Sequence, residues 1–399
     1  MAAGSYQNFS GGLYPENRNL PPPAHLAAGL SLAAQILPRN SAGAVDTIGG
    51  KIVLLSIGMS NATQEFSAFK SLADADAAKN PRLVIVDGAQ GGQTAAIISD
   101  STANFWRVID QRLRNANVTR AQVQVAWVKE ADARPTQAFP VHAQILSSEM
   151  EIIARILQAK YPHIKIAHWA SRIYAGYATT TLNPEPFAYE SGFAVKWLIE
   201  KQITGDTTLS FNRVRPKAPW LAWGPYLWAD GTTPRQDGLL WECRDFQNDG
   251  THPAPAGRTK VANLLLNFFK SAPTTVSWFL KSPATSVEAT GNTLPRGFML
   301  EQNYPNPFWS GATSPARSGG NPNTVISFQL PVVSDVRVAI YSMNGQLVRQ
   351  LVNGKFASGE HQVVWNGNDD FGRRVANGSY FYQLIAGEVR ATKRMVLLK

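Results

Sequence analysis

Two short stretches of the sequence carry the residue types that nucleophilic catalysis needs. Ser60 stands in the run GMSN (58–61), between a predicted strand and a stretch compatible with a helix. At such a turn the serine oxygen is exposed, and the field of the helix N-terminus favours a developing negative charge. In the DGTH run, Asp249 can hold one imidazole nitrogen of His252 and leave the other as a general base. The alternatives are a helix-capping serine and a coincidental Asp-x-x-His spacing.

A glycine-rich run, GAQGGQT (88–94), follows the next predicted strand. Glycines let the backbone approach a ligand and point its N–H groups at it, which is what an oxyanion requires. A tight turn that needs a positive φ is the alternative. The run lacks both the GxGxxG pattern and a closing Lys-Ser/Thr, so it is not typical of a phosphate-binding loop.

Further candidates for substrate contact follow the later predicted strands. Arg172, Glu185 and Glu190 can bind polar groups of a substrate, or can form a buried ion pair that anchors a long loop. The segment 219–246 is rich in aromatic residues, whose flat faces suit stacking on sugar rings. Packing beneath the loop is the alternative for this segment. The aromatic candidates are Trp223, Trp228, Trp241 and Tyr226.

The elements that position these residues are visible as periodic patterns. Five short, β-branched apolar runs are typical of strands buried on both faces. Helical spacing of apolar residues occurs between and after them, as in 144–160 and 257–270. Alternating strands and helices predict a parallel sheet in a three-layer α/β/α domain over 51–275, with residues 1–50 as an N-terminal extension that packs on it. The predicted strands are 51–58, 81–88, 123–129, 164–170 and 219–224.

The remainder of the chain has a different composition and period. Residues 276–297 are rich in Ser, Thr, Pro and Ala, which predicts a linker. Over 298–399 apolar and polar residues alternate in several short runs, with Asn-Gly pairs at 344–345 and 366–367 as turn signals. This pattern predicts an all-β, Ig-like sandwich as a second domain.

The order of these motifs along the first domain resembles the SGNH (GDSL-type) hydrolases, which have a flavodoxin-like α/β fold. The resemblance implies that Ser60 is the nucleophile, that His252 is its general base and that Asp249 orients the histidine. It also implies that the N–H groups of Ser60 and Gly92 stabilise the oxyanion. The sequence leaves Asp245 as an alternative to Asp249 for the orienting carboxylate.

The sequence departs from the family pattern at two points. The family's Gly-Asp-Ser start is Gly-Met-Ser here (58–60), and the third block, Gly-x-Asn-Asp, has no counterpart. The asparagine of that block donates to the oxyanion, so another donor must replace it. Lys129, at the corresponding strand end, is the candidate for that donor as a cation. A pairing of Lys129 with Glu130 or a surface carboxylate is the alternative.

The second domain resembles the type IX secretion (type A) sorting domain, which is related to the Ig-like domain of flagellar hook-capping proteins. The run NYPNPF (303–308) and the basic end KRM (393–395) carry this resemblance. It implies a bacterial protein that crosses the inner membrane on a cleaved signal and is released or attached outside the cell by the type IX secretion machinery. Residues 1–50 show no signal-peptide pattern, so we expect an export signal to have been removed.

Composition excludes several classes of protein. Among the 399 residues there is one cysteine, Cys243, which excludes an intramolecular disulfide framework, and the six histidines are scattered, so we expect no metal site and no cofactor. No run of about 18 apolar residues occurs, which excludes a transmembrane helix. The net charge of +10 is spread over both domains without a long Lys/Arg block, so nucleic acid is not an expected partner.

These observations predict a secreted or cell-surface serine esterase that hydrolyses carboxylic esters, with acetyl groups on a polysaccharide as the favoured substrate. An esterase or lipase acting on small molecules or polyesters is one alternative. A non-catalytic extracellular carbohydrate-binding protein is the other alternative, and the two departures from the family pattern favour it.

Overall fold

The five predicted strands form one parallel sheet. They are β3 (Ile52–Gly58), β4 (Leu83–Val86), β5 (Val123–Lys129), β6 (Ile166–Trp169) and β7 (Trp220–Trp223). Their order across the sheet is β4-β3-β5-β6-β7. Every residue of β3, β5, β6 and β7 is buried, which requires cover on both faces of the sheet. The predicted α/β class with a parallel sheet is therefore confirmed.

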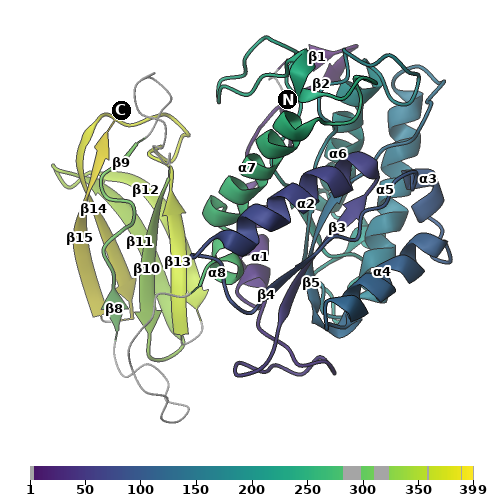
Figure 1. Ribbon diagram of the computed structural model, residues 1–399. Helices are drawn as coiled ribbons and strands as arrows, with labels where there is room; N and C mark the ends of the chain where they lie inside the picture. The colour runs from purple at the N-terminus through teal and green to yellow at the C-terminus, as the bar shows by residue number, and fades with distance from the viewer. Residues whose placement is uncertain (1–3, 282–297, 310–322, 357–358, 388, 399) are drawn as a thin grey trace. The chain divides into compact units, whose positions relative to one another are not determined.

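The computed structural model describes residues 4–281, 298–309, 323–356, 359–387 and 389–398. The chain divides into two units, Met1–Ala284 and Thr285–Lys399, and each is described by itself (Figure 1). The parallel sheet and its helices belong to the first unit. The regular elements described in the second unit are all β-strands.

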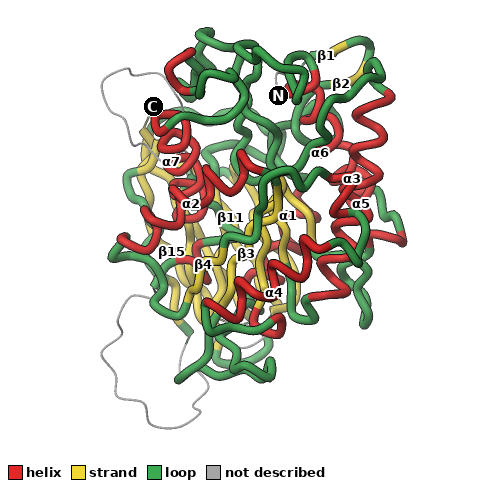
Figure 2. The backbone as a smooth tube through the Cα atoms, turned by 45° about the vertical axis from the view of Figure 1, so that its right-hand side comes forward, coloured by secondary structure: helices red, strands yellow, loops and turns green. Residues whose placement is uncertain are grey.

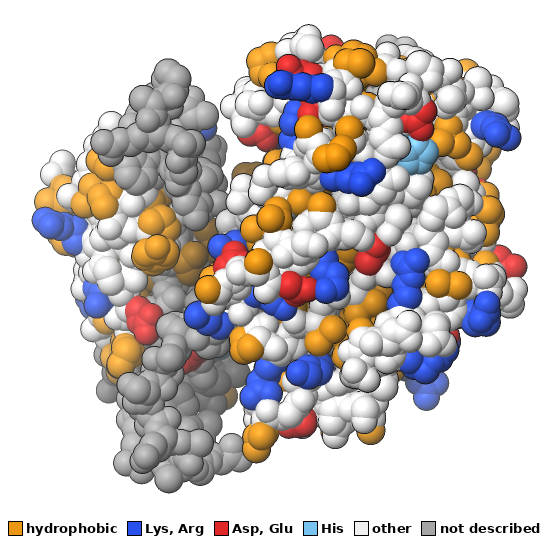
Figure 3. Space-filling view, in the orientation of Figure 1, with side chains coloured by type: hydrophobic (Ala, Val, Ile, Leu, Met, Phe, Trp, Pro, Cys, Tyr) orange, Lys and Arg blue, Asp and Glu red, His pale blue; other side chains and the backbone are white. Residues whose placement is uncertain are grey.

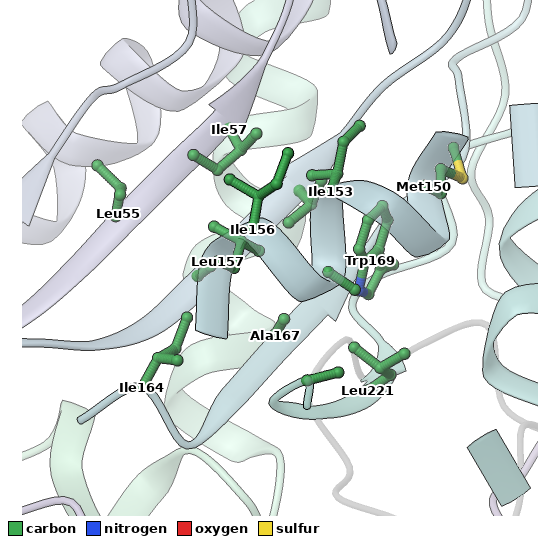
Figure 4. Close-up of a cluster of buried hydrophobic side chains, with 14 of the residues drawn as sticks. Leu55, Ile57, Met150, Ile153, Ile156, Leu157, Ile164, Ala167, Trp169 and Leu221 are labelled. Atoms are coloured by element: carbon green, nitrogen blue, oxygen red, sulfur yellow. The ribbon is translucent and has the colours of Figure 1, made fainter. Parts of the chain in front are cut away.

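Helices cover both faces of the parallel sheet (Figures 1 and 2). One face packs against α4 (Asn104–Asn115), α5 (Val141–Lys160) and α6 (Phe187–Ile203). The other packs against α1 (Pro23–Ala33), α2 (Ser60–Ala75), α7 (Pro255–Ser271) and α8 (Val276–Phe279). Leu55 and Ile57 of β3 lie with residues of α5, as Figure 4 shows, whereas Leu54 lies in the cluster on the α2 face. This is the predicted three-layer arrangement.

The packing of α2 against α7 sets the positions of the two candidate catalytic segments. α2 begins at Ser60, and α7 begins at Pro255, shortly after His252. Between the two helices, Phe69 is fully buried, and its ring centroid lies 5.2 Å from that of Phe269. This apolar contact joins the helix that begins at Ser60 to the helix that follows His252.

The N-terminal residues cover the edge of the sheet at β7. The His25 Nε2 atom lies 2.8 Å from the carbonyl oxygen of Leu221. The Nε1 atom of Trp223 donates to the carbonyl oxygen of Leu13 at 2.6 Å. Because an edge strand otherwise presents unpaired backbone groups, these contacts protect it. A short hairpin, β1 (Ser5–Tyr6) with β2 (Phe9–Ser10), precedes this segment.

The predicted linker at 276–297 begins too early. Residues 276–279 form α8, and the side chains of Trp278 and Phe279 are fully buried among the aromatic residues of α2 and α7. The N–H of Lys281 also donates to the carbonyl oxygen of Ala78 at 2.8 Å. The composition of this segment predicts a linker, but two large apolar residues are enough to attach its Ser/Thr-rich start to the core. Residues 282–297 lie outside the described residues.

The second unit contains two sheets that enclose one core. The strands are β8 (Met299–Leu300), β9 (Phe308–Trp309), β10 (Thr324–Leu330), β11 (Ser334–Ser342), β12 (Leu347–Phe356), β13 (Gly359–Trp365), β14 (Gly378–Ala386) and β15 (Val389–Leu398). The sheet orders are β13-β10-β8 and β12-β11-β14-β15-β9. Phe328 and Trp365 of one sheet share a buried cluster with Tyr382 and Leu384 of the other. The unit agrees with the predicted Ig-like sandwich.

The NYPNPF run has a structural role in the second unit. The backbone N–H of Asn303 donates to the hydroxyl of Tyr382 at 2.9 Å, and its side-chain Nδ2 donates to the Thr324 hydroxyl at 2.8 Å. Asn303 is buried between the two sheets' side chains. The run therefore ties its own segment to both β10 and β14.

Charge on the first unit is dispersed. Figure 3 shows Lys and Arg side chains scattered over the visible face, interspersed with Asp and Glu and without one large basic patch. Among the helices of the described residues, none is long and apolar enough to cross a membrane.

The α2–α7 contact gives a first test of this fold. Phe69→Ala removes a fully buried aromatic side chain, so we expect a loss of about 3–5 kcal/mol in the free energy of unfolding. Leu72→Ala, on the exposed side of the same helix, is the matched control and should cost less than about 1 kcal/mol. Urea denaturation followed by tryptophan fluorescence measures both. Equal losses in the two variants would contradict the packing described.

Candidate active site

Ser60 is the first residue of α2 and contacts a histidine. Its Oγ lies 2.7 Å from Nε2 of His252. The N-cap of α2 is Met59, which makes no side-chain cap, so the reading of Ser60 as a capping residue is wrong. A Cβ at Gly58 would lie 2.4 Å from the carbonyl oxygen of Lys129. Only glycine therefore lets β3 turn this closely into the helix.

Asp249 holds the other nitrogen of His252. The His252 Nδ1 atom lies 2.5 Å from Asp249 Oδ2. The backbone N–H groups of His252 and Thr251 donate to Oδ1 of the same carboxylate at 2.9 and 3.0 Å. Burial raises the pKa of Asp249, but the hydrogen bonds from His252 and these backbone groups lower it further, so its pKa lies below the ordinary value. Asp249 is therefore ionised at neutral pH.

Asp245 is engaged elsewhere. Its Oδ2 lies 2.5 Å from Nζ of Lys260 and accepts the backbone N–H of Glu242 at 2.8 Å. Among the described residues the carboxylate in contact with the His252 ring is that of Asp249, which favours Asp249 over Asp245 as the orienting carboxylate.

The loop that carries Asp249 and His252 is held from two sides. A Cβ at Gly250, whose φ is +62°, would lie 1.8 Å from the carbonyl oxygen of Tyr177. The side-chain amide of Asn61 donates to the Thr251 carbonyl oxygen at 2.9 Å. The residue next to Ser60 thus fixes the loop that brings His252 to it.

The glycine-rich loop lies beside Ser60. The Gln90 N–H donates to the Gly58 carbonyl oxygen at 2.8 Å, which joins this loop to the end of β3. Gly92 has a φ of +74°, so the tight-turn reading holds. It also lines a cavity with Ser60, and its N–H donates to no other group of the described residues. Both readings of the loop are compatible with this backbone.

A cavity of about 290 Å³ opens at Ser60. Residues from six stretches of the chain bound it, and besides Ser60 the polar ones are Asn61, Thr94, Asp132, Arg172, Asn183 and His252. A second cavity of about 270 Å³ shares Asp132, Ala133 and Asn183 with the first and reaches His142. The two cavities therefore have a common wall.

Lys129 does not reach this cavity, which corrects its predicted role as an oxyanion donor. Its Nζ donates to both carboxylate oxygens of Glu65, at 2.6 and 2.5 Å, and both side chains are fully buried. Burial lowers the pKa of Lys129 to about 8 and raises that of Glu65, while each partner opposes the shift of the other. The pairing with Glu130 is also wrong. A buried lysine needs a carboxylate to compensate its charge, because water cannot reach it. Glu65 of α2 is that carboxylate.

The predicted aromatic substrate site is wrong. Trp241 and Trp223 are buried, and the Nε1 atom of each donates to a main-chain carbonyl. Trp228 donates to Glu185 at 2.8 Å, and the Tyr226 ring packs edge-on against Trp223. None of the four lines the cavity at Ser60. The long segment after β7 has little regular structure, so these rings supply its core.

Arg172 lines the cavity, whereas the two glutamates grouped with it do not. Its side chain is 3% exposed, and its Nε and Nη2 atoms have no hydrogen-bond partner in the described structure. Glu185 accepts the N–H groups of Ala175 and Tyr189 at 2.9 and 3.0 Å. The reading of Arg172 as half of a buried ion pair is therefore wrong, and its role in substrate binding stays a prediction.

Two residues at the cavities escaped the sequence reading. His142 Nε2 lies 2.6 Å from Glu190 Oε2, in the wall of the second cavity. Asn183 lies in the common wall, and its buried Oδ1 has no hydrogen-bond partner among the described residues. No local pattern marks either residue, because the partners come from separate segments. The described residues contain no cluster of three or more potential metal ligands.

Part of the second unit matches a known sequence family. Residues 314–387 match the model of the FlgD Ig-like domain. A search of curated proteins finds no match for this chain.

Solved structures similar to this chain include acylhydrolase- and acetyltransferase-type proteins, at low identity. A candidate acylhydrolase from Bacteroides fragilis is 14% identical and covers 61% of this chain and 95% of that chain, with a TM-score of 0.33. The periplasmic domain of a lipopolysaccharide acetyltransferase from Salmonella Paratyphi A is 12% identical over 61% and 94%, with a TM-score of 0.32. PorZ, a surface component of the type IX secretion system of Porphyromonas gingivalis, is 20% identical over 25% of this chain and 11% of that chain, with a TM-score of 0.18.

The buried pair beneath the site gives a test. Glu65→Gln leaves the Lys129 ammonium buried without a counter-charge, so we expect a loss of about 3–5 kcal/mol in the free energy of unfolding. The double variant Glu65→Leu/Lys129→Met replaces the pair by apolar groups and should recover most of that loss. Urea titrations at pH 7 compare the three proteins. A double variant no more stable than Glu65→Gln would contradict the account.

Proposed function

We propose that the first unit is a serine esterase that hydrolyses carboxylic esters. The observation that carries the proposal is the continuous chain of hydrogen bonds from Ser60 Oγ to His252 and on to Asp249, at the edge of a cavity. A serine, a histidine and a carboxylate joined in this way are suited to acyl transfer on many unrelated folds.

In the first half of the reaction, Ser60 Oγ attacks the ester carbonyl carbon while His252 Nε2 takes the hydroxyl proton. The Asp249 carboxylate accepts from Nδ1–H, so it selects the tautomer with Nε2 free and stabilises the imidazolium that forms. The tetrahedral intermediate collapses when His252 returns the proton to the alcohol oxygen. The products of this half are the free alcohol and an acyl group on Ser60.

In the second half, water replaces the alcohol. His252 takes a proton from water as the oxygen attacks the acyl carbon, and it then protonates Ser60 Oγ as that bond breaks. The carboxylic acid leaves. The Ser60 and Gly92 N–H groups are the proposed oxyanion donors, and the N-terminus of α2, a 16-residue helix, adds a favourable field at Ser60.

We assign acetyl groups on a polysaccharide as the substrate. The cavity of about 290 Å³ is of a size for a short acyl group with part of a sugar, and it presents Asn61, Asn183 and Arg172 to hydroxyl groups. A cavity of this volume is small for a long acyl chain, which makes the lipase alternative less suitable. The buried tryptophans give no support to sugar binding.

Replacement of the nucleophile tests the esterase directly. Ser60→Ala should lower kcat/KM for p-nitrophenyl acetate and for acetylated xylan by about a thousandfold or more, because no other group forms the acyl-enzyme. Ser71→Ala, at an exposed serine of the same helix, is the matched control and should keep wild-type rates. Wild-type protein that binds xylan without releasing acetate would instead favour the non-catalytic carbohydrate-binding alternative.

We further propose that the protein acts outside a bacterial cell and that the second unit directs its export through type IX secretion. The match of residues 314–387 to an Ig-like domain and the resemblance of 298–399 to sorting domains support this proposal.

Truncation tests the export proposal. In a bacterium that has type IX secretion, the full chain behind a cleavable export signal should reach the medium or the cell surface. A variant that ends at residue 297 should stay in the periplasm. Immunoblots of the fractions measure the distribution, and a strain that lacks the translocon is the control. Equal release of both proteins would contradict the proposal.

A further inference from the structure

Arg172 presents a buried guanidinium to the Ser60 cavity. It follows β6, and it lines the cavity together with Ser60 and His252. Its side chain is nearly inaccessible, yet Nε and Nη2 have no hydrogen-bond partner in the part of the chain that the structure describes. A buried guanidinium without partners is costly, so its retention needs a reason.

The carboxyl groups of Glu65, Glu185 and Glu130 act on Arg172 through space, but none of them makes an ion pair with it among the described residues. Glu65 is held by Lys129 at 2.5 Å, and Glu185 accepts two backbone N–H groups and the Trp228 indole. Burial raises the pKa of Glu130 well above its ordinary value, and its Oε1 has no hydrogen-bond partner among the described residues.

Asp132 is the acidic residue in the cavity wall itself. Its Oδ1 accepts the Ala96 N–H at 3.0 Å. Burial, with the neighbouring Asp132 carboxyl, raises the pKa of Glu149 to about 8, so Glu149 stays protonated beside it. Asp132 makes no ion pair with Arg172 among the described residues. Two of the three guanidinium nitrogens therefore have no hydrogen-bond partner in the described part of the chain.

We propose that Arg172 binds a carboxylate of the substrate and that the natural substrate is an acetylated acidic polysaccharide, such as an acetylated polyuronate. This inference rests on the proposed esterase function. The forked donors of a guanidinium match the two oxygens of a carboxylate. Asn183, whose buried Oδ1 also lacks a partner, would accept a sugar hydroxyl in the same wall.

The charge of the whole chain is an independent observation in favour of a polyanion. The net charge is +10, and the basic residues are dispersed rather than gathered in one patch (Figure 3). A dispersed positive surface raises the local concentration of a long acidic polymer without fixing its orientation. Arg172 would then select the sugar whose acetyl group lies at Ser60.

The experiment compares one polymer with and without its charge. Acetylated polygalacturonate and the same material after methyl esterification are the two substrates, and acetate release gives kcat/KM for each. The wild-type protein should prefer the charged polymer. Arg172→Met should lower the ratio of charged to neutral kcat/KM by about tenfold to a hundredfold, and Arg172→Lys should lower it less. Arg107→Met, which removes one exposed positive charge, should leave the ratio as in the wild type.

Other outcomes overturn the inference. A loss in Arg172→Met that is equal on both polymers would mean that Arg172 acts on the acyl oxygen of every ester or supports the fold. A fall in Tm accompanying that loss would indicate the structural role, whereas removal of an unpartnered buried charge should leave Tm unchanged or raise it. If p-nitrophenyl acetate is hydrolysed in a Ser60-dependent way but the charged polymer is not preferred, the esterase function is retained and the role of Arg172 in binding a carboxylate is contradicted. No hydrolysis of any ester would remove both.

Discussion

The hydrogen bond of 2.7 Å between Ser60 and His252 is the contact on which the account depends, because it joins residues 192 positions apart in the chain. Neither residue could reach the other without the sheet order that places their segments at the same edge. An aromatic contact joins α2 to α7, and Asn61 ties the His252 loop to the start of α2. The first unit is thus organised around holding two loops in hydrogen-bond reach.

Beneath the site, the protein separates its buried charges into two kinds. Lys129 and Glu65 neutralise each other, and their ion pair joins the end of β5 to α2. Arg172, on the neighbouring strand end, is left without such a partner. A buried ion pair contributes to positioning, whereas a buried cation that lines a cavity without an ion-pair partner is suited to binding. Of the two basic residues at this edge of the sheet, Lys129 therefore supports the structure, and Arg172 is the one suited to binding a ligand.

Local patterns predicted the five strands, the three layers and the candidate residues Ser60, Asp249 and His252. Hydrophobic periodicity, glycine turns and short residue spacings depend on residues that are close in the sequence. The partner of Lys129, the burial of Trp241 and the pairing of His142 with Glu190 could not be predicted in this way. Each depends on which distant segments meet in the fold, and a side chain such as Trp241 has the same local sequence whether it is buried or faces a ligand. The start of the linker was misplaced for the same reason, since Trp278 and Phe279 find their core only in three dimensions.

The central claim is that Ser60 is a nucleophile activated by His252. Its most direct measurement is the labelling of the full chain with a fluorophosphonate, followed by peptide mass spectrometry to locate the adduct. The account predicts one adduct per chain, on the peptide that contains Ser60, and its loss in His252→Ala. An unlabelled protein, or an adduct on a different serine, would contradict the claim.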